Sequence, residues 1–256
     1  MTWRVPTRLR VELVLKTRDK VPNHSFMLQQ LKTNFQSVQN RIADAAAKAS
    51  RNADEITLVG VTKYVDVATT RGLFEAGCVD LGENRPQVVW EKSSALAELP
   101  INWHMIGHLQ RNKVKRMVER CGLIHSVDSE RLLTAIDKAA AEQEKTCRVL
   151  LEINVSGESA KHGFSKQEIP AALEFVSGLK HIQVEGLMCM AGLVGDADDA
   201  RREFAMLRGV KEEFESDSPS NVDLKELSMG MSGDFEIAIE EGATLVRVGS
   251  LLFDGV

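Results

Sequence analysis

One lysine follows directly on a segment that has the composition of a buried strand. The segment ITLVGVTKYVD, residues 56–66, is apolar and rich in β-branched side chains until it reaches Lys63. A lysine in that place must be solvated, paired with an acid, or engaged in chemistry. Its amine could form a Schiff base with an aldehyde, and the structural alternative is a strand-end lysine that extends to solvent.

Two glycine-containing segments near the C-terminus have the composition of a phosphate site. SMGMSGD, residues 228–234, combines glycines with serine hydroxyls and precedes the helical segment DFEIAIEEG. RVGS, residues 247–250, adds Gly249 and Ser250. Glycine lets backbone N–H groups approach an anion, and a helix N-terminus favours negative charge. Each segment alone could be an ordinary turn, where glycine and serine are common, but two such segments together favour an anion site.

Further polar side chains occur in or after other expected strands. Asn84 follows the second expected strand, His104 lies in the third and Arg247 in the last. Arg247 could donate a hydrogen bond to the ring nitrogen of a cofactor, or form an ion pair with a neighbouring acid. A metal-dependent hydrolase could use His104 and His108, but the sequence places no carboxylate cluster beside them. We therefore expect no metal site.

Alternating strands and helices must position these residues. Helical segments such as RNKVKRMVERC, SERLLTAIDKAAAEQEK and DADDARREFAMLRGVKEEFES separate the apolar runs, which predicts βαβ units and a parallel sheet. Eight strands in 256 residues fit a single (β/α)8 TIM barrel better than an open doubly wound sheet. No G-x-G-x-x-G motif follows the first strand, which disfavours a Rossmann fold. The expected strands are residues 56–62, 78–82, 102–107, 123–127, 148–155, 182–189, 225–230 and 245–252.

A long amphipathic helix is expected before the first strand. Residues 1–24 are basic and irregular and are predicted to be an N-terminal extension, so that the barrel domain comprises residues 25–256. The apolar stripe of the helix should pack on the core of its own domain, with a partner-binding face as the alternative. The residues of the stripe are Met27, Leu28, Leu31, Phe35, Val38 and Ile42.

Composition and charge narrow the functional class. The formal net charge of −5 argues against a general nucleic-acid binder. No apolar run approaches the about 20 residues that span a bilayer, and charges interrupt the N-terminal apolar residues, unlike a signal peptide. We expect a cytoplasmic protein with no membrane or nucleic-acid partner. The four cysteines form no C-x-x-C pair and are predicted to be reduced thiols: Cys78, Cys121, Cys147 and Cys189.

Six segments, in this order, resemble the YggS/PROSC family of pyridoxal phosphate homeostasis proteins: LVGVTKYV, DLGENRPQ, WHMIGHLQRNK, LLEINVSGESAKHGF, VEGLMCMAG and ELSMGMSGDFEIAIEEGATLVRVGSLLFD. The resemblance covers residues 28–254, and GHLQRNK and LSMGMSGD with VRVGS are its most diagnostic parts. It implies a barrel similar to the N-terminal domain of alanine racemase, of fold-type III, with pyridoxal 5′-phosphate (PLP) as cofactor.

The resemblance also implies roles for single residues. Lys63 would bear the Schiff base, Arg247 would face the pyridine nitrogen, and Asn84 and His104 would line the ring. The phosphate would be held by Ser228, Gly249 and Ser250, with backbone contacts from Met229. The sequence departs from the family at Thr62, where a serine is usual, at Arg85, where an aromatic residue is common, and at His162, where a small residue is usual.

These expectations favour a PLP carrier over an enzyme. The barrel takes up nearly the whole chain, whereas racemases of this fold draw a catalytic tyrosine from a second domain of a partner subunit. The one tyrosine in this sequence, Tyr64, follows Lys63 directly, so no evident group serves the opposite face in two-base racemisation. We expect a monomer that holds PLP reversibly and delivers it to PLP-dependent apoenzymes. The alternative is an amino-acid racemase or a related enzyme that acts on small amino acids.

Overall fold

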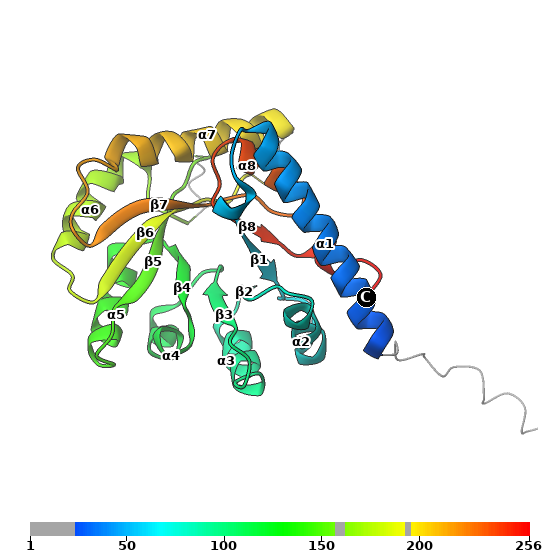
Figure 1. Ribbon diagram of the computed structural model, residues 1–256. Coiled ribbons are helices and arrows are strands. Elements are labelled where there is room, and N and C mark those ends of the chain that lie inside the picture. Colours follow the sequence, from blue (N-terminus) through cyan, green and yellow to red (C-terminus); the bar gives the residue numbers. More distant parts are fainter. Residues whose placement is uncertain (1–23, 157–161, 193–195) are drawn as a thin grey trace, which may run out of the picture.

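The structure is a computed structural model that describes residues 24–156, 162–192 and 196–256. The predicted extension, residues 1–24, lies outside this part of the chain except for its last residue. The remaining residues form eight parallel strands, which close into a barrel in sequence order (Figure 1). The strands are β1 (Thr57–Val61), β2 (Asp80–Glu83), β3 (Asn102–Met105), β4 (Leu123–Val127), β5 (Cys147–Glu152), β6 (Ile182–Met188), β7 (Val222–Ser228) and β8 (Leu245–Val248).

The (β/α)8 barrel predicted from the alternation of strands and helices is confirmed. All eight expected strands exist, and their bounds shift by a few residues. The largest shift is at the end of β8, where Gly249 leaves the strand conformation with φ −121° and ψ −78°. The chain then turns into a short 3-10 helix, η4 (Ser250–Phe253). The predicted strand ran on to residue 252 because Leu251 and Leu252 continue its apolar pattern, although Gly249 and Ser250 are residue types common in turns.

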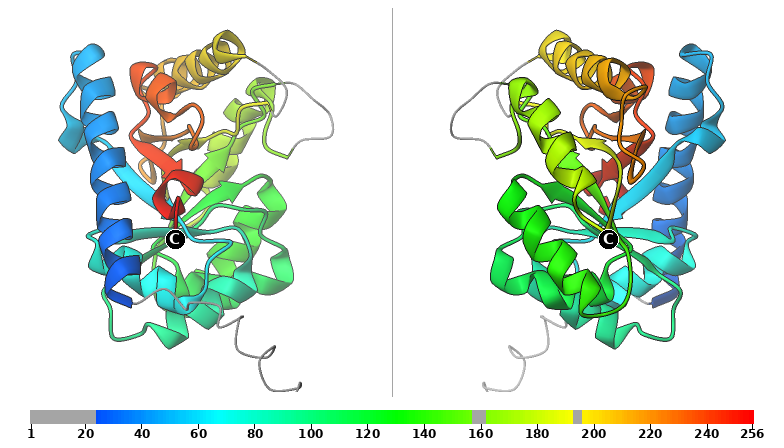
Figure 2. Two further views of the ribbon diagram at one scale, coloured as in Figure 1. Left: turned by 90° about the vertical axis from the view of Figure 1, so that its right-hand side faces the viewer. Right: turned by 90° about the vertical axis from the view of Figure 1, so that its left-hand side faces the viewer.

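Helices follow the strands and cover the outside of the barrel (Figures 1 and 2). The longest of them begins with a capping box, in which Asp196 accepts from the backbone N–H of Asp199 at 3.0 Å. Asp66 caps the helix after β1 by accepting from Thr69 N–H at 2.8 Å. The helices are α2 (Val67–Glu75), α3 (Pro86–Ala95), α4 (Val114–Arg120), α5 (Glu130–Ala141), α6 (Ile169–Ser177), α7 (Ala197–Phe214) and α8 (Phe235–Glu240).

The N-terminal helix α1 (His24–Lys48) packs along the outside of the barrel, beside α2, α8 and the C-terminal turn (Figure 2). Leu31, Val38 and Ile42 of its apolar stripe are buried, which confirms packing on the domain's own core. The Asn34 side-chain amide donates to Leu252 O at 3.1 Å and to Asp254 O at 2.9 Å. This helix therefore fixes the chain that follows β8, where the glycine of RVGS lies.

Two apolar clusters form the core. The larger lies between strands and helices, and the smaller fills the inside of the barrel with Val59, Leu123, Leu150, Met188 and Leu245. Side chains alternate along a strand, so residues two positions further on these strands also face inward. Above the apolar layer, toward the C-terminal ends of the strands, three of these inward positions carry buried polar side chains: His125, Glu152 and Arg247.

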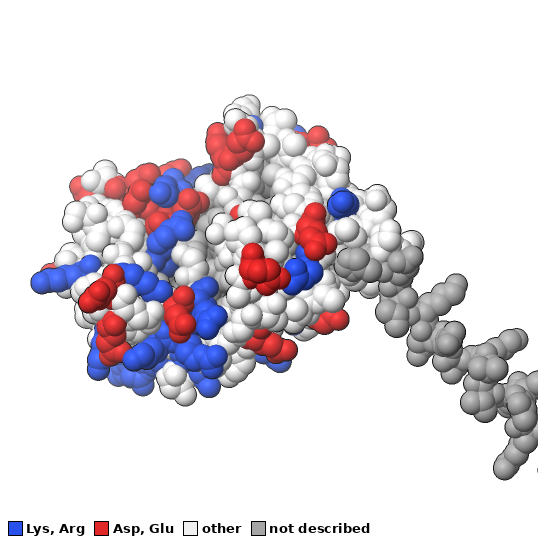
Figure 3. Space-filling view, turned by 60° about the horizontal axis from the view of Figure 1, so that its bottom comes forward, with Lys and Arg blue, Asp and Glu red and all other residues white. Residues whose placement is uncertain are grey.

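Basic side chains gather on the surface over α4 and α5 (Figure 3). The segment that includes α4 contributes Arg111, Lys113, Lys115, Arg116 and Arg120. The Arg116 guanidinium lies 4.1 Å from the centre of a Trp90 ring, which anchors it on α3.

In the described part of the chain, no helix is both long enough and apolar enough to cross a bilayer.

Candidate functional site

Lys63 lies just past the end of β1, at the mouth of the barrel. It lies two residues beyond Val61, the last residue of β1, in the turn that precedes α2. Its side chain is exposed, and its ammonium lies 4.9 Å from the centre of the Tyr64 ring. Among residues 24–156, 162–192 and 196–256, no carboxylate lies within ion-pair distance of this ammonium. Of the three roles that the sequence left open, pairing with an acid is not observed among these residues.

The glycine and hydroxyl segments meet beside this lysine. β8 is the neighbour of β1, with Val248 opposite Gly60, so Gly249 lies next to the last residues of β1. A Cβ at Gly249 would lie 3.3 Å from Val61 O, so the two strand ends approach closely. The Gly249 N–H donates to Ser232 Oγ at 3.1 Å, which joins the turn after β7 to the end of β8. We call Ser232, Gly249 and the exposed Ser250 the glycine–hydroxyl corner.

The turn after β7 requires a glycine. Gly230 has φ +86°, and a Cβ there would lie 2.5 Å from Ala238 Cβ on α8. The Asp234 carboxylate accepts from Met231 N–H at 2.5 Å and closes the turn in front of α8. These contacts place Ser232 at the rim and leave Ser228 inside the barrel.

Arg247 is buried under the rim, with 4% of its surface exposed. It donates from one terminal nitrogen to Ser228 Oγ at 2.6 Å and from the other to Cys189 O at 2.9 Å. Burial lowers its pKa, but a guanidinium remains protonated in proteins at physiological pH. The side chain is thus a fixed positive charge just below the mouth.

A chain of buried hydrogen bonds runs from Arg247 to the other end of the barrel. Ser228 Oγ lies 2.8 Å from His125 Nδ1, and His125 Nε2 lies 2.8 Å from His104 Nδ1. His104 Nε2 lies 3.0 Å from Asp80 Oδ1, at the start of β2. Complete burial, with His104 and Arg247 nearby, holds the pKa of His125 well below its ordinary value, so this ring is neutral.

The two charged ends set the direction of these hydrogen bonds. The Asp80 carboxylate only accepts, so His104 donates from Nε2 and, when neutral, accepts at Nδ1 from His125. His125 then accepts at Nδ1 from the Ser228 hydroxyl, which in turn accepts from Arg247. We call these five residues the Asp80–Arg247 chain. It fixes the guanidinium and occupies the Ser228 hydroxyl.

A buried ion pair anchors the end of β1 on its outer side. Lys92 of α3 donates to Glu83 Oε1 at 2.6 Å and to Thr62 O at 2.7 Å, and all three residues are buried. The Thr62 hydroxyl donates to the same Glu83 oxygen at 2.6 Å. The residue before Lys63 is therefore held by both its backbone carbonyl and its side chain.

Glu152 is a buried carboxyl at the end of β5, with 5% of its surface exposed. Burial raises its pKa from 4.5 to about 7, Asp128 adds to the rise, and His162 and Arg247 oppose it. Near neutral pH this side chain therefore exists in both protonation states.

The stability of the fold should depend on pH through Glu152. Because its folded pKa is raised, the folded state binds more protons than the unfolded state between about pH 4.5 and 7. The contribution of Glu152 to the free energy of unfolding is up to about 3 kcal/mol. It is present below this pH window and is lost as the pH rises through it. The free energy of unfolding of Glu152→Gln, minus that of the unchanged chain, should therefore be larger at pH 8 than at pH 5 by on the order of 2 kcal/mol. Urea unfolding at both pH values measures this.

The matched control for this prediction is Glu212→Gln, at a side chain that is 66% exposed. It should show the same pH dependence as the unchanged protein. If Glu152→Gln also keeps that pH dependence, the assignment of the titration to Glu152 is wrong.

The fold brings part of the predicted site together. Lys63, Gly249 and Ser250 lie at adjacent strand ends on the mouth of the barrel. Asn84 is half-buried at the end of β2, where a Cβ at Gly107 would lie 2.4 Å from Asn84 O.

Four other predicted residues are buried and bonded within the barrel. Ser228, His104 and Arg247 belong to the Asp80–Arg247 chain, and the Met229 N–H donates to Leu245 O at 3.1 Å. Cofactor contacts by these residues remain predictions. The hydroxyl that contacts the backbone of the corner is Ser232.

Several site residues were not predicted from the sequence, although two of them carry a signal that could have identified them. His125 and Glu152 interrupt the apolar runs LIHSV and VLLEINV, the same signal that drew attention to Lys63. Glu83 directly precedes Asn84, but nothing in the sequence links it to Lys92. That pairing depends on how α3 packs against β2.

Known proteins are similar to this chain in sequence. The sequence matches the family described as alanine racemase, N-terminal domain, over residues 27–255. It is 40% identical over 216 residues to a pyridoxal phosphate homeostasis protein of Aquifex aeolicus, covering 84% of this chain and 94% of the relative. It is 36% identical over 220 residues to the protein of that name from Pseudomonas aeruginosa, covering 86% and 93%.

Solved structures agree with the sequence matches. PipY of Synechococcus elongatus, solved with PLP bound, is 35% identical, with a TM-score of 0.73 and coverage of 83% of this chain and 99% of PipY. Alanine racemase of Clostridium difficile is 16% identical, with a TM-score of 0.67, and shows the fold alone over 88% of this chain and 56% of the racemase. The chain belongs to the alanine racemase N-terminal domain family and, within it, to the pyridoxal phosphate homeostasis proteins, as the six sequence motifs indicated.

Proposed function

We propose that this chain binds PLP at the mouth of its barrel and takes part in PLP homeostasis, holding the cofactor on Lys63 without robust catalysis. The observation that carries the proposal is the exposed Lys63 amine beside the glycine–hydroxyl corner. In support, PipY has been solved with PLP bound, and the curated relatives are named pyridoxal phosphate homeostasis proteins. The proposal includes a cytoplasmic location, a monomer, and delivery of PLP to apoenzymes.

The residues present fit such a cofactor. PLP supplies an aldehyde that a lysine amine takes up as a Schiff base with loss of water, and a phosphate that anchors it. Lys63 offers the amine. Ser232, Gly249 and Ser250 offer hydroxyls and backbone where two strand ends meet, at the position where TIM barrels commonly bind phosphate. Arg247 lies on the neighbouring strand with a charge that would face the ring nitrogen.

The electrostatics of the site favour holding the cofactor over reacting with it. Arg247 stays protonated, so it can only donate to a ring nitrogen, and its charge disfavours a proton there. The adjacent His125 is neutral, because its pKa is held well below the ordinary value. A ring nitrogen without a proton withdraws electrons weakly, so proton removal from a bound amino acid gains little.

Tyrosine does not supply an acid for the opposite face of the site. Tyr64 is the one tyrosine of the chain, and it is 86% exposed with its ring against the Lys63 ammonium. It therefore lies on the same side as the lysine. This arrangement supports a carrier over a two-base racemase.

Titration of the purified full-length chain with PLP tests the proposal. We expect a yellow protein with about one PLP per chain and, after borohydride reduction, a single peptide labelled at Lys63. A chain that stays colourless and unlabelled would refute PLP binding. Rapid exchange of α-protons across a panel of amino acids would instead support the racemase alternative.

A further inference from the structure

A second group of ligand-type side chains lies on the strands opposite Lys63. His108 follows β3, Asp128 follows β4 and His162 follows β5, so three consecutive strand ends bring them together. His108 Nδ1 lies 3.0 Å from Asp128 Oδ2, and His162 Nδ1 lies 3.6 Å from the same oxygen. The two imidazole rings stack with centres 4.5 Å apart and planes at 20°.

The spacing of these atoms matches a tetrahedral metal site. Zinc bonds of about 2.1 Å to nitrogen and oxygen put neighbouring ligand atoms about 3.4 Å apart. The two measured distances, 3.0 Å and 3.6 Å, lie on either side of that value, and one ligand atom from each residue lies within 4.8 Å of the others. Because a metal ion lies in the plane of each imidazole that binds it, at least one of the two stacked rings must rotate about its side-chain torsions for both to reach the same ion.

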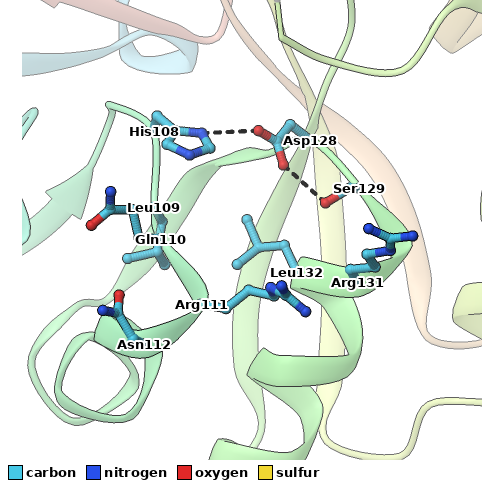
Figure 4. A pocket seen from close by; sticks show the side chains of 9 residues that line it. All are labelled: His108, Leu109, Gln110, Arg111, Asn112, Asp128, Ser129, Arg131 and Leu132. Carbon is cyan, nitrogen blue, oxygen red and sulfur yellow. Dashed lines mark hydrogen bonds and ion pairs between the residues drawn. The ribbon is translucent and has the colours of Figure 1, made fainter.

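The carboxylate is already oriented for this role. Asp128 has only 9% of its side chain exposed, and the Ser129 hydroxyl donates to its Oδ1 at 3.1 Å. Oδ2 is thereby turned toward both histidines (Figure 4 shows His108, Asp128 and Ser129). Hydrogen bonds of this kind orient metal ligands in proteins.

We propose that His108, Asp128 and His162 bind a divalent transition-metal ion of the zinc class, with the fourth position open. Two imidazoles and one carboxylate are ligands that zinc accepts, and three protein ligands with an open position are typical of reactive rather than structural zinc sites. The site is independent of Lys63 and of PLP. The sequence alone predicted no such site, because Asp128 is 20 residues away from His108.

The open position adjoins a solvent-accessible cavity of about 550 Å³. His108 and Asp128 line this cavity together with Arg111 and Arg131 (Figure 4). Both arginines are exposed, so solvent and salt screen their repulsion of a metal ion. Their charge favours an anion, such as hydroxide or a carboxylate, as the fourth ligand.

The competing explanation is a simple hydrogen bond from His108 to Asp128, with His162 stacked on the ring. The two explanations differ in what they predict for metal ions, because a histidine that serves only as a hydrogen-bond partner of Asp128 gives no stoichiometric Zn²⁺ binding at this group.

Isothermal titration calorimetry with Zn²⁺ tests the proposal on the untagged, reduced, full-length chain. We expect about one Zn²⁺ per chain. His108→Ala and His162→Ala should each weaken binding by at least about 100-fold, since loss of a ligand should cost as much as or more than loss of its hydrogen-bond partner. Folding of both variants is checked by circular dichroism.

The matched control is His181→Ala. His181 Nδ1 also lies near an aspartate, 3.8 Å from Asp137 Oδ1, but it is outside the three-residue group. This variant should bind Zn²⁺ as the unchanged chain does.

Three results would overturn the proposal: no binding, binding unaffected by His108→Ala and His162→Ala, or equal loss in His181→Ala. Cobalt substitution adds a further check. A thiolate charge-transfer band in the Co²⁺ spectrum would place the ion at a cysteine and refute the assignment.

Discussion

Lys63→Ala is expected to abolish the visible absorbance of the PLP-treated chain and the borohydride label. The amine is the one group of the proposed site that can bond covalently to an aldehyde, and it is exposed at the mouth of the barrel. Binding should fall to the weaker, non-covalent association that the phosphate alone can make with the glycine–hydroxyl corner. Absorbance spectra, fluorescence titration with PLP and mass spectrometry after reduction measure the loss.

Two further variants distinguish the effect of the Lys63 amine on PLP loading from the effect of its positive charge and from that of other lysines. Lys63→Arg keeps the positive charge at the rim but offers no reactive amine, so it should also remain colourless. Lys115→Ala changes a lysine that is 74% exposed on α4, and it should load PLP as the unchanged chain does. If Lys63→Ala keeps its colour while Lys115→Ala loses it, the cofactor is attached elsewhere.

Lys92→Met should destabilise the fold strongly. It leaves the Glu83 carboxylate buried without its cation and frees the Thr62 carbonyl that Lys92 holds at 2.7 Å. Breaking a buried ion pair by removing one partner costs about 3–5 kcal/mol. In a domain of this size, that corresponds to a fall in Tm of roughly 10 °C, measured by calorimetry or urea unfolding.

A double-mutant cycle with Glu83→Gln shows whether the pair itself is responsible. Removing both charges eliminates the uncompensated carboxylate, so the double variant should be less destabilised than the sum of the single variants. Additive effects would mean that the two side chains do not depend on each other. Lys92→Met should also weaken PLP loading, because Thr62 positions Lys63, whereas the distant Glu98→Gln should leave loading unchanged.

The order of elements and the place of the reactive amine follow from the sequence. Apolar β-branched runs separated by amphipathic segments predicted the eight strands, and the parallel barrel followed because such strands need helical crossovers. Since all strands of a parallel barrel end on the same face, Lys63, Gly249 and Ser250 could be assigned to a common rim. Local pattern and one rule of topology were sufficient for these predictions.

Only the tertiary structure decided which polar groups meet inside the barrel and across its mouth. His125 and Ser228 are 103 residues apart, and their contact depends on the register of strands that are not neighbours. The same holds for His162 and Asp128, which come together only once β4 and β5 are paired. Periodicity tells which face of a strand a side chain occupies. It does not tell how high in the barrel the side chain lies, because strand stagger and closure of the sheet set that height.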